Sequence, residues 1–171
     1  MEIRDAQVED AASACQVLRR SISELCVPDH GNDLMILTRW LNNKTPENVA
    51  SWIARPDNSV LVAVEYGKIL AVGSVTDAGE VTLNYVSPDA RFRGISRAML
   101  RALETRAVER GNLRCTLTST ETARRFYRAN GYVEDGRLDG KFGTPASYIM
   151  SKLLTTKNSC VAKGSGCSSI N

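Results

Sequence analysis

The sequence predicts a single mixed α/β domain, and three features of the chain carry this prediction. Amphipathic helical patterns come first, three strand-like runs follow, and a strand, a basic glycine loop and a further helix come next. The 171 residues are 43% hydrophobic and 24% charged, an ordinary composition for one globular domain. We therefore expect one domain over residues 1–154. The polar, Gly/Ser-rich residues 155–171 are expected to form a disordered tail.

The first part of the chain is expected to be a short strand followed by helices. Apolar residues recur at helical spacing as far as Leu25, and Thr45 with Pro46 forms a good helix start, since Thr caps a helix and Pro suits its first position. The expected elements are a strand over Glu2–Arg4, helices over Val8–Leu25, over Leu34–Leu41 and from Pro46 onward, and a break at Cys26–Gly31.

Three β-rich runs then form an antiparallel meander. Val60–Glu65 and Ile69–Val75 are joined by Tyr66-Gly67, which is typical of a hairpin turn, and Glu80–Val86 follows after a second turn. Side chains alternate between the two faces of a strand. We therefore expect Glu80, Thr82, Asn84 and Val86 to share one face of the third run.

A basic loop, Arg91–Ser96, is the strongest candidate for a binding site. Pro88 ends the strand before it, and an amphipathic helix follows and ends near Gly111. A helix N-terminus leaves backbone N–H groups unpaired and carries about half a positive charge. Gly94 lets the backbone approach a phosphate, and the arginines of the loop, with Arg97, add positive charge. The loop therefore predicts a pyrophosphate site; the alternative is a solvated basic turn before a core helix.

The last part of the chain alternates strands and helices. Leu113–Thr118 has the alternation of a strand, and a helix is expected between Thr120 and Tyr132. Two further strands are expected near Val133–Asp135 and over Ser147–Leu153. The Gly136–Pro145 segment between them is rich in turn residues and is expected to be a loop.

Two sequence patterns identify a family. Val86-Ser87-Pro88 leads into Arg-x-x-Gly-x-Ser over Arg91–Ser96, and Thr-x-x-Ala-x-x-x-Tyr-x-x-x-Gly-Tyr covers Thr120–Tyr132. These patterns resemble motifs A and B of the GCN5-related N-acetyltransferase (GNAT) superfamily, where the family has Gly or Ala at Ser96 and Asn at Thr120. The resemblance covers roughly Ile3 to Leu154. The phosphate loops GxxxxGK[ST] and GxGxxG are absent, which disfavours P-loop and dinucleotide enzymes.

The resemblance implies a strongly twisted mixed β-sheet of six to seven strands with helices on both faces. It also implies direct transfer of an acetyl group from acetyl-CoA to a primary amine of a small molecule or peptide, within one ternary complex. A freed backbone N–H near Val86 would meet the thioester oxygen. The residues expected to bind the cofactor are Tyr85, Val86, Arg91, Phe92, Arg93, Gly94, Ile95, Ser96, Arg97, Thr120 and Ala123.

Two residues are candidates for the chemistry. By resemblance, Tyr127 donates a proton to the leaving thiolate of coenzyme A, a task that a phenol can perform. An attacking amine must lose its proton, and Glu80 is the candidate base because the histone-acetylating branch of the family has its glutamate at a similar offset. The alternative is that Glu80 is only a solvated strand end.

The acceptor is expected to meet the early helical region. His30, Asp29 and Asn84 are candidate substrate contacts, and Trp40 is a further one. The alternative for His30 and Asp29 is turn chemistry beside a glycine, and for Trp40 a place in the core.

Composition limits the remaining function classes. The net charge of +3 makes general nucleic-acid binding unlikely to be the role of this chain. Five cysteines form no CxxC pair and there is one histidine, so we expect reduced thiols, a buried Cys115 and no metal. The absence of a long apolar run predicts a cytoplasmic protein without a membrane partner, and a homodimer is possible. An acyl-CoA sensor and an aminoacyl-tRNA acetyltransferase stay open as alternative functions.

Overall fold

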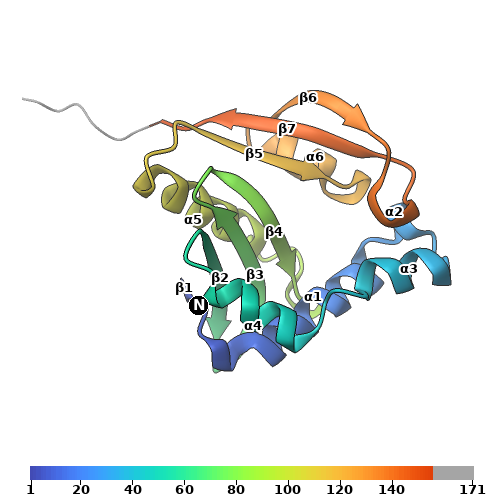
Figure 1. Cartoon of the computed structure of the whole chain (residues 1–171), viewed down its shortest axis with the longest axis horizontal. Coiled ribbons are helices and arrows are strands. Elements are labelled where there is room, and N and C mark those ends of the chain that lie inside the picture. Colours follow the sequence, from blue (N-terminus) through green and yellow to red (C-terminus); the bar gives the residue numbers. More distant parts are fainter. Residues whose placement is uncertain (156–171) are drawn as a thin grey trace, which may run out of the picture.

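The chain forms one seven-stranded sheet with the strand order β1-β2-β3-β4-β5-β7-β6 (Figure 1). The computed structural model describes residues 1–155, so the expected tail, with Cys160 and Cys167, lies outside the described residues except for its first residue. Neighbouring strands are antiparallel except β4 and β5, which are parallel. The strands are β1 (Glu2–Asp5), β2 (Asn58–Glu65), β3 (Lys68–Thr76), β4 (Glu80–Val86), β5 (Arg114–Ser119), β6 (Val133–Leu138) and β7 (Ser147–Leu153).

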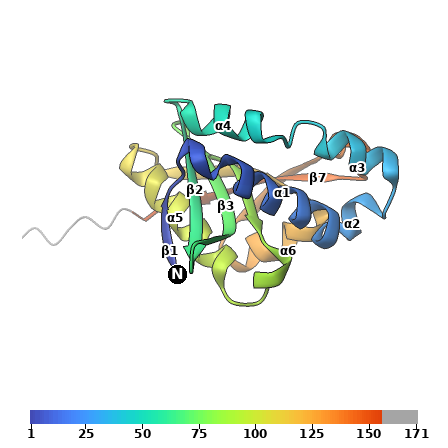
Figure 2. The same cartoon turned by 90° about the horizontal axis from the view of Figure 1, so that it is seen from below.

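Helices cover both faces of this sheet (Figure 2). The α-helices are α1 (Ala11–Leu25), α2 (Val27–His30), α3 (Leu34–Leu41), α4 (Pro46–Ala54), α5 (Ile95–Glu109) and α6 (Glu121–Ala129), and the 3-10 helices are η1 (Val8–Asp10), η2 (Pro88–Ala90) and η3 (Lys141–Gly143). The predicted class, a mixed α/β sheet with helices on both faces, is confirmed. The longest described helices have 15 residues, and none in residues 1–155 combines the length and apolar character that a membrane crossing requires.

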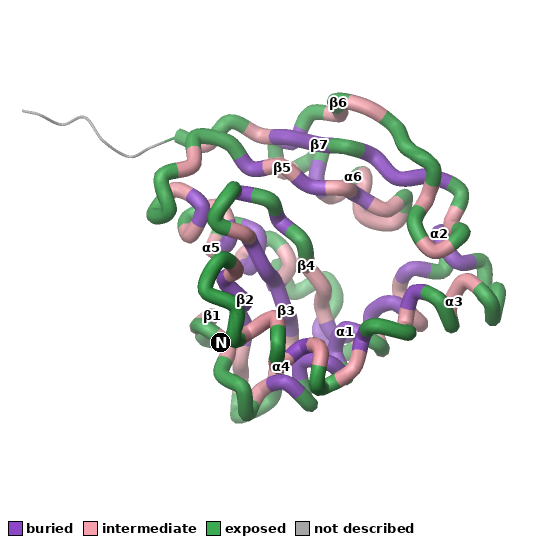
Figure 3. The backbone as a smooth tube through the Cα atoms, in the orientation of Figure 1, coloured by how far each residue is buried: buried purple, intermediate pink, exposed green. Residues whose placement is uncertain are grey.

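Two apolar layers hold the helices to the sheet. Met99 and Leu103 of α5 pack on one face, and Leu18 of α1 belongs to the layer on the other face. Gly73 of β3 makes the first contact possible, since a Cβ there would lie 2.8 Å from Met99 and 2.9 Å from Leu103. Figure 3 shows the consequence: β2 and β3 are largely buried, whereas the edge strand β6 is half-buried or exposed.

Several element boundaries differ from the predicted ones for local reasons. The break after α1 contains the one-turn helix α2, because Pro28 fits a first turn and Gly31, at φ 55°, ends it. Val8–Asp10 is a 3-10 turn in which Asp10 accepts the backbone N–H of Gln7. Strand β6 continues to Leu138 because its ladder with β7 extends to the pair Leu138 and Ser147.

A bulge in β4 changes which side chains share a face. Val75 pairs with Val81 and Ser74 with Leu83, so Thr82 is the extra residue. The prediction that Glu80 shares a face with Asn84 and Val86 is therefore wrong. Val81 and Val86 pack in the α5 layer, whereas an uninterrupted alternation would put them on opposite faces.

Strands β4 and β5 pair at only two positions before they separate. Glu80 pairs with Thr116 and Val81 with Leu117, and beyond these pairs the two strands diverge (Figure 1). The later residues of β4 remain paired with β3 on their other side. The sheet therefore opens in its middle, between two strand edges whose backbone groups face the opening.

Candidate active site

A cavity of about 540 Å³ lies at this opening, and we call it the α5 cavity. It is bounded by β4, the loop after η2, the first turn of α5, the end of β5 and the start of α6. The sequence-predicted residues that line it are Asn84, Tyr85, Val86, Arg91, Phe92, Gly94, Ile95, Ser96, Arg97, Thr120, Ala123 and Tyr127. Residues that two separate motifs single out therefore meet at one cavity.

The N-terminus of α5 supplies the polar wall of the α5 cavity. Gly94 is the N-cap at φ 76°, and the first helical hydrogen bond runs from the Ala98 N–H to the Gly94 carbonyl at 3.0 Å. The N–H groups of residues 95–97 thus have no acceptor within the helix. A Cβ on Gly94 would meet no atom within 4 Å, so the space before these groups is open. With Arg91 and Arg97 beside it, this wall suits a phosphate-bearing ligand.

Arg93 does not belong to that wall. Its Nη2 donates to both carboxylate oxygens of Glu65, at 3.0 and 2.7 Å, and the residue does not line the α5 cavity. The loop turns at Phe92, which has φ 61° and a 93% exposed side chain, with the Arg91 guanidinium carbon 4.6 Å from its ring centroid. The sequence indicates a basic loop but does not determine which of its arginines face the ligand.

Tyr127 of α6 lines the α5 cavity next to Asn84 of β4. Its side chain is 7% exposed and packs edge-on against the rings of Phe126 and Tyr132, with centroids 5.2 and 5.6 Å away. Burial raises the pKa of Tyr127 to about 12, and the neighbouring Asn84 amide partly offsets this rise. The Asn84 Oδ1 is buried without a hydrogen-bond partner among residues 1–155. An unpaired buried acceptor therefore lies beside the phenol.

Glu80 lies at the other end of β4 from Val86. It is exposed at the start of β4, and it lines neither the α5 cavity nor the second cavity described below. Its chain neighbours Val81 and Thr82 line the α5 cavity, but Glu80 itself does not. The structure does not bring the predicted base to the predicted acid.

His30 and Asp29 line neither the α5 cavity nor the second cavity described below, and both side chains have partners inside the protein. The His30 ring is 1% exposed; its Nδ1 accepts the Asn32 N–H at 2.9 Å, and its Nε2 lies 3.0 Å from the Ile22 carbonyl. Asp29, 3% exposed, accepts the N–H of Glu121 at 2.7 Å, the N–H of Thr122 at 3.1 Å and the Thr122 hydroxyl. Both side chains therefore have their polar atoms occupied inside the protein.

Asp29 accepts the first N–H groups of α6, although it precedes Glu121 by 92 residues. This contact predicts an effect on stability. Asp29→Asn should lower the free energy of unfolding by about 1–2 kcal/mol, because an amide leaves one of the buried donors unpaired. Urea unfolding at pH 7 measures the loss. Asp33→Asn is the matched control, since the exposed Asp33 caps α3 and Asn is an equally good cap there. Equal losses in the two variants would contradict the special role of Asp29.

A second cavity of about 360 Å³, the α4 cavity, lies on the other side of the β4–β5 opening. The residues that line both cavities are Thr82, Leu83 and Tyr85 of β4 and Thr118, Ser119 and Thr120 at the end of β5. Trp40 lines the α4 cavity and stacks on Phe142, with ring centroids 5.9 Å apart. The two cavities therefore meet where the strands separate.

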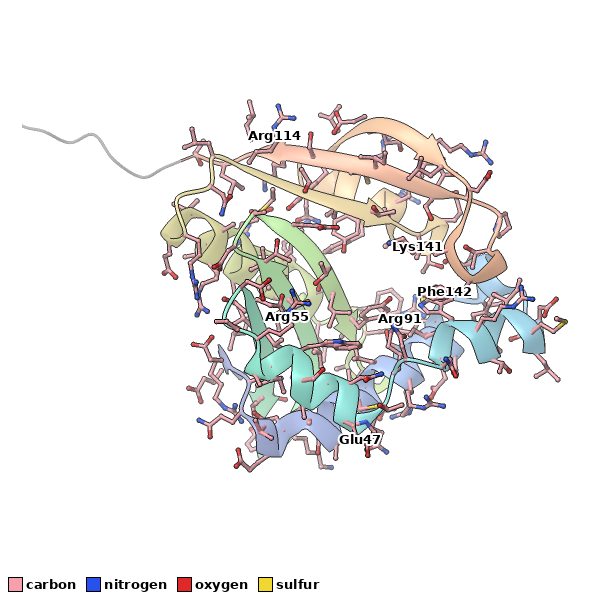
Figure 4. All side chains as sticks on the ribbon, in the orientation of Figure 1. Glu47, Arg55, Arg91, Arg114, Lys141 and Phe142 are labelled. Carbon is pink, nitrogen blue, oxygen red and sulfur yellow. The ribbon has the colours of Figure 1, made fainter. Side chains whose placement is uncertain are left out.

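Sequence reasoning missed most of the α4 cavity. Lys44 precedes α4, Trp52 lies in its last turn and Arg55 follows it. Lys141 and Phe142 come from η3 in the opposite half, and Figure 4 labels them together with Arg55. The sequence predicts a loop over Gly136–Pro145, which contains Lys141 and Phe142, but no signal marks Lys44. A lysine before a capped helix is ordinarily solvated, and its burial here depends on rings that are distant in sequence.

The cysteines of the described part are poor nucleophiles. Cys26 lines the α5 cavity, but burial raises the pKa of its thiol to about 12. Cys115 is fully buried, as predicted, and burial raises its pKa to about 11. Within residues 1–155, no three His, Cys, Asp or Glu side chains gather in a way that would hold a metal ion.

Several solved structures share this fold. The chain is similar to a GCN5-related N-acetyltransferase described as an aminotransferase, class II, from Rhodopseudomonas palustris, with 24% identity, a TM-score of 0.80 and coverage of 90% of this chain and 95% of that one. It is also similar to the PaiA N-acetyltransferase of Thermoplasma acidophilum in complex with coenzyme A, with 20% identity, a TM-score of 0.73 and coverage of 89% and 98%. A third structure is yncA, a putative acetyltransferase from Salmonella typhimurium with its cofactor acetyl-CoA, with 20% identity, a TM-score of 0.70 and coverage of 93% and 96%.

A family model agrees with the motifs and the fold. The model of the acetyltransferase (GNAT) domain matches residues 26–145. This range contains the α5 loop, Tyr127 and nearly all residues that line the two cavities. The chain is therefore an acyltransferase that belongs to the GNAT acetyltransferase family.

Proposed function

We propose that this protein transfers an acetyl group from acetyl-CoA directly to a primary amine of a small molecule or peptide, within one ternary complex. The observation that carries the proposal is the pair of cavities that meet at the β4–β5 opening. One cavity has a wall suited to phosphate, and the other is lined by aromatic and polar side chains. Two ligands bound in them would bring their reacting ends together where the strands separate.

The residues of the α5 cavity fit coenzyme A. The open space before Gly94, the free N–H groups of residues 95–97 and the side chains of Arg91 and Arg97 would hold the diphosphate. The unpaired Asn84 Oδ1 would accept an amide N–H from the pantetheine arm. Bound there, acetyl-CoA supplies an acetyl thioester, and the unpaired backbone N–H groups of β4 beyond Val81 are available to its carbonyl oxygen.

Tyr127 would stabilise the leaving sulfur. With a pKa of about 12 it stays protonated throughout the neutral range and can donate its hydrogen bond to a developing thiolate. Because a thiol has a pKa of about 8.5, the thiolate does not take the proton of this phenol outright, so Tyr127 acts mainly as a donor. We therefore assign it a direct role in the transition state.

The attacking amine must reach the thioester uncharged. No carboxylate lines either cavity among residues 1–155, which removes Glu80 from the proposed mechanism. Two lysines line the α4 cavity instead, and positive charge nearby lowers the pKa of an ammonium group. We propose that the amine loses its ammonium proton to water on entry. The second proton, which the nitrogen releases once the C–N bond has formed and the C–S bond breaks, passes through water to the departing thiolate, so no side-chain base is required.

Direct transfer is favoured over an acetyl-enzyme intermediate. Cys26 lines the α5 cavity, but with a pKa of about 12 only about one thiol in 10⁵ is ionised at pH 7. A thiolate, and not a thiol, is the nucleophile in such an exchange. Cys26 is therefore assigned to packing beside the cofactor.

The test is thiol release from acetyl-CoA across amines, amino acids, peptides and an acylated tRNA, with calorimetric titration of acetyl-CoA alongside. We expect binding and turnover with one acceptor class. Binding without turnover on any acceptor would favour an acyl-CoA sensor. Turnover on acylated tRNA alone would favour the tRNA alternative, and the absence of acetyl-CoA binding would overturn the proposal.

Gly94→Ala should weaken acetyl-CoA binding about tenfold. An alanine at φ 76° costs about 1–2 kcal/mol, and its methyl group would stand in the space assigned to phosphate. Gly67→Ala is the matched control, because Gly67 has φ 73°, also has no atom within 4 Å of a Cβ, and lies in the β2–β3 hairpin outside the α5 cavity. Similar losses of thermal stability but a binding defect only in Gly94→Ala are expected. Equal affinity for acetyl-CoA in the two variants would contradict the assignment of the phosphate to this loop.

A further inference from the structure

The α4 cavity is lined by cations and by no anion. Its charged lining residues are Lys44, Arg55 and Lys141, and no carboxylate lines it within residues 1–155. Arg55 is already paired, since its guanidinium donates to both oxygens of Asp57 at 3.0 and 2.7 Å. The two lysines therefore carry the charge that this cavity offers to a ligand.

Lys44 is an unusual side chain for a lysine. It is only 6% exposed, and its ammonium group lies 5.9 Å from the Trp52 ring centroid and 5.6 Å from that of Phe142. The ammonium group donates one hydrogen bond within the described residues, to the Asn43 Oδ1 at 2.6 Å. Buried cations are ordinarily paired with an anion. No anion pairs with the Lys44 ammonium group among the described residues, and a bound ligand could supply one.

Lys141 brings a second positive charge to the same space from the other half of the protein. It is exposed on η3, next to Phe142, whose ring lies beside the Lys44 ammonium. Burial, together with the charge of Lys141, lowers the pKa of Lys44 to about 8. Both side chains line one cavity, so an anion bound there would be attracted by both charges.

We propose that the acetyl acceptor is a primary amine that carries an anionic group, a carboxylate or a phosphonate, in the same small molecule. Lys44 and Lys141 bind the anionic group, and the aromatic rings around Lys44 cover the adjoining carbon atoms. The amine then points toward the β4–β5 opening. This inference rests on the proposed function, because it names the acceptor of that reaction. The same two charges disfavour polyamines and aminoglycosides, whose several ammonium groups would meet no counterion here.

The first arm of the test compares acceptors that differ only in charge. Acetylation of free L-amino acids is measured against the same compounds as primary carboxamides, with 2-aminoethylphosphonate and spermidine added. We expect kcat/KM to be about tenfold or more higher for each acid than for its carboxamide, since one well-placed charge pair is worth about that factor. Faster acetylation of carboxamides or of spermidine would overturn the inference and leave the acetyltransferase proposal intact.

The second arm of the test repeats the acceptor comparison with a variant in which the charge at Lys141 is inverted. Lys141→Glu should lower the acid-to-carboxamide ratio at least about tenfold, because it puts a carboxylate beside the bound anion. Lys141 is exposed, so the fold should be retained, and an unchanged melting temperature verifies this. Lys68→Glu is the control: Lys68 is also exposed, lies in the β2–β3 hairpin and lines neither cavity, so the ratio should stay as in the wild type. An unchanged ratio in Lys141→Glu would overturn the inference.

A binding arm separates failure of this inference from failure of the proposed function. N-acetylated amino acids, which resemble the product, are titrated calorimetrically into the protein saturated with coenzyme A. Binding that weakens in Lys141→Glu but not in Lys68→Glu supports the anion site even if no acceptor in the panel is turned over. The absence of such binding in the wild type, combined with no preference for acids, would overturn it.

Discussion

Tyr127→Phe is expected to lower kcat about 100-fold while the dissociation constant of acetyl-CoA stays within about twofold. The phenol is held between the rings of Phe126 and Tyr132 and faces the α5 cavity, so removing its oxygen leaves the packing intact. What is lost is the hydrogen bond to the leaving sulfur, a contact that matters in the transition state and contributes a factor of about 10²–10³. Single-turnover thiol release and calorimetry measure the two quantities separately.

Tyr132→Phe serves as the control for this prediction. Tyr132 packs against Tyr127, and its buried hydroxyl has no hydrogen-bond partner among residues 1–155. It lines neither cavity. Turnover in Tyr132→Phe should match the wild type, and the free energy of unfolding should be the same or slightly higher because an unpaired buried hydroxyl is removed. Equal turnover in wild type and Tyr127→Phe would show that another group stabilises the leaving thiolate.

Lys44→Met is expected to stabilise the protein at pH 7 by up to about 3 kcal/mol, although we assign Lys44 a role in binding the acceptor. Burial lowers the pKa of Lys44 from 10.5 to about 8, and each pKa unit corresponds to about 1.4 kcal/mol. Between these two pKa values the unfolded chain binds more protons than the folded one, so wild-type stability rises with pH there. Below pH 8 the whole cost is present, and methionine, with a similar length and no charge, avoids it.

Urea unfolding of both proteins at several pH values tests the sign of this effect. The advantage of Lys44→Met should be full below pH 8 and should shrink toward zero as the pH rises to 10.5. Lys141→Met is the comparison, since the exposed Lys141 carries no burial cost and should change stability little. A less stable Lys44→Met protein at pH 7 would mean that the Lys44 ammonium is well solvated in the folded state.

Local patterns in the sequence predicted most of the fold and one side of the site. The hairpin at Tyr66-Gly67, the cap at Thr45 and the loop Arg91–Ser96 are all specified by neighbouring residues, and the structure has them as expected. The motif residues around Gly94 and Tyr127 are likewise contiguous in the chain. A turn, a helix cap or a glycine loop depends on adjacent residues, so it can be recognised without knowing which distant residues it contacts.

The parts that failed depend on partners distant in the chain. Asp29 looks like a turn residue beside Gly31, but its acceptor atoms are used at the N-terminus of α6. Glu80 appeared to face Asn84 because the bulge at Thr82 depends on pairing with β3 and leaves no composition signal. The ring of Phe142, which lies beside the Lys44 ammonium group, comes from the other half of the protein. None of these outcomes is visible in the local sequence.

The opening between β4 and β5 also bears on how this protein avoids aggregation. A sheet edge with free N–H and C=O groups ordinarily invites pairing with strands of other molecules. The outermost strands are protected by other means, since β1 has only four residues and β6 is lined with charges such as Glu134, Asp135 and Arg137. The two inner edges face each other across the cavities and are not presented to other molecules. An extended small ligand bound in the cavities could pair with these edges. The fold thus keeps unsatisfied backbone available for recognition at little risk of self-association.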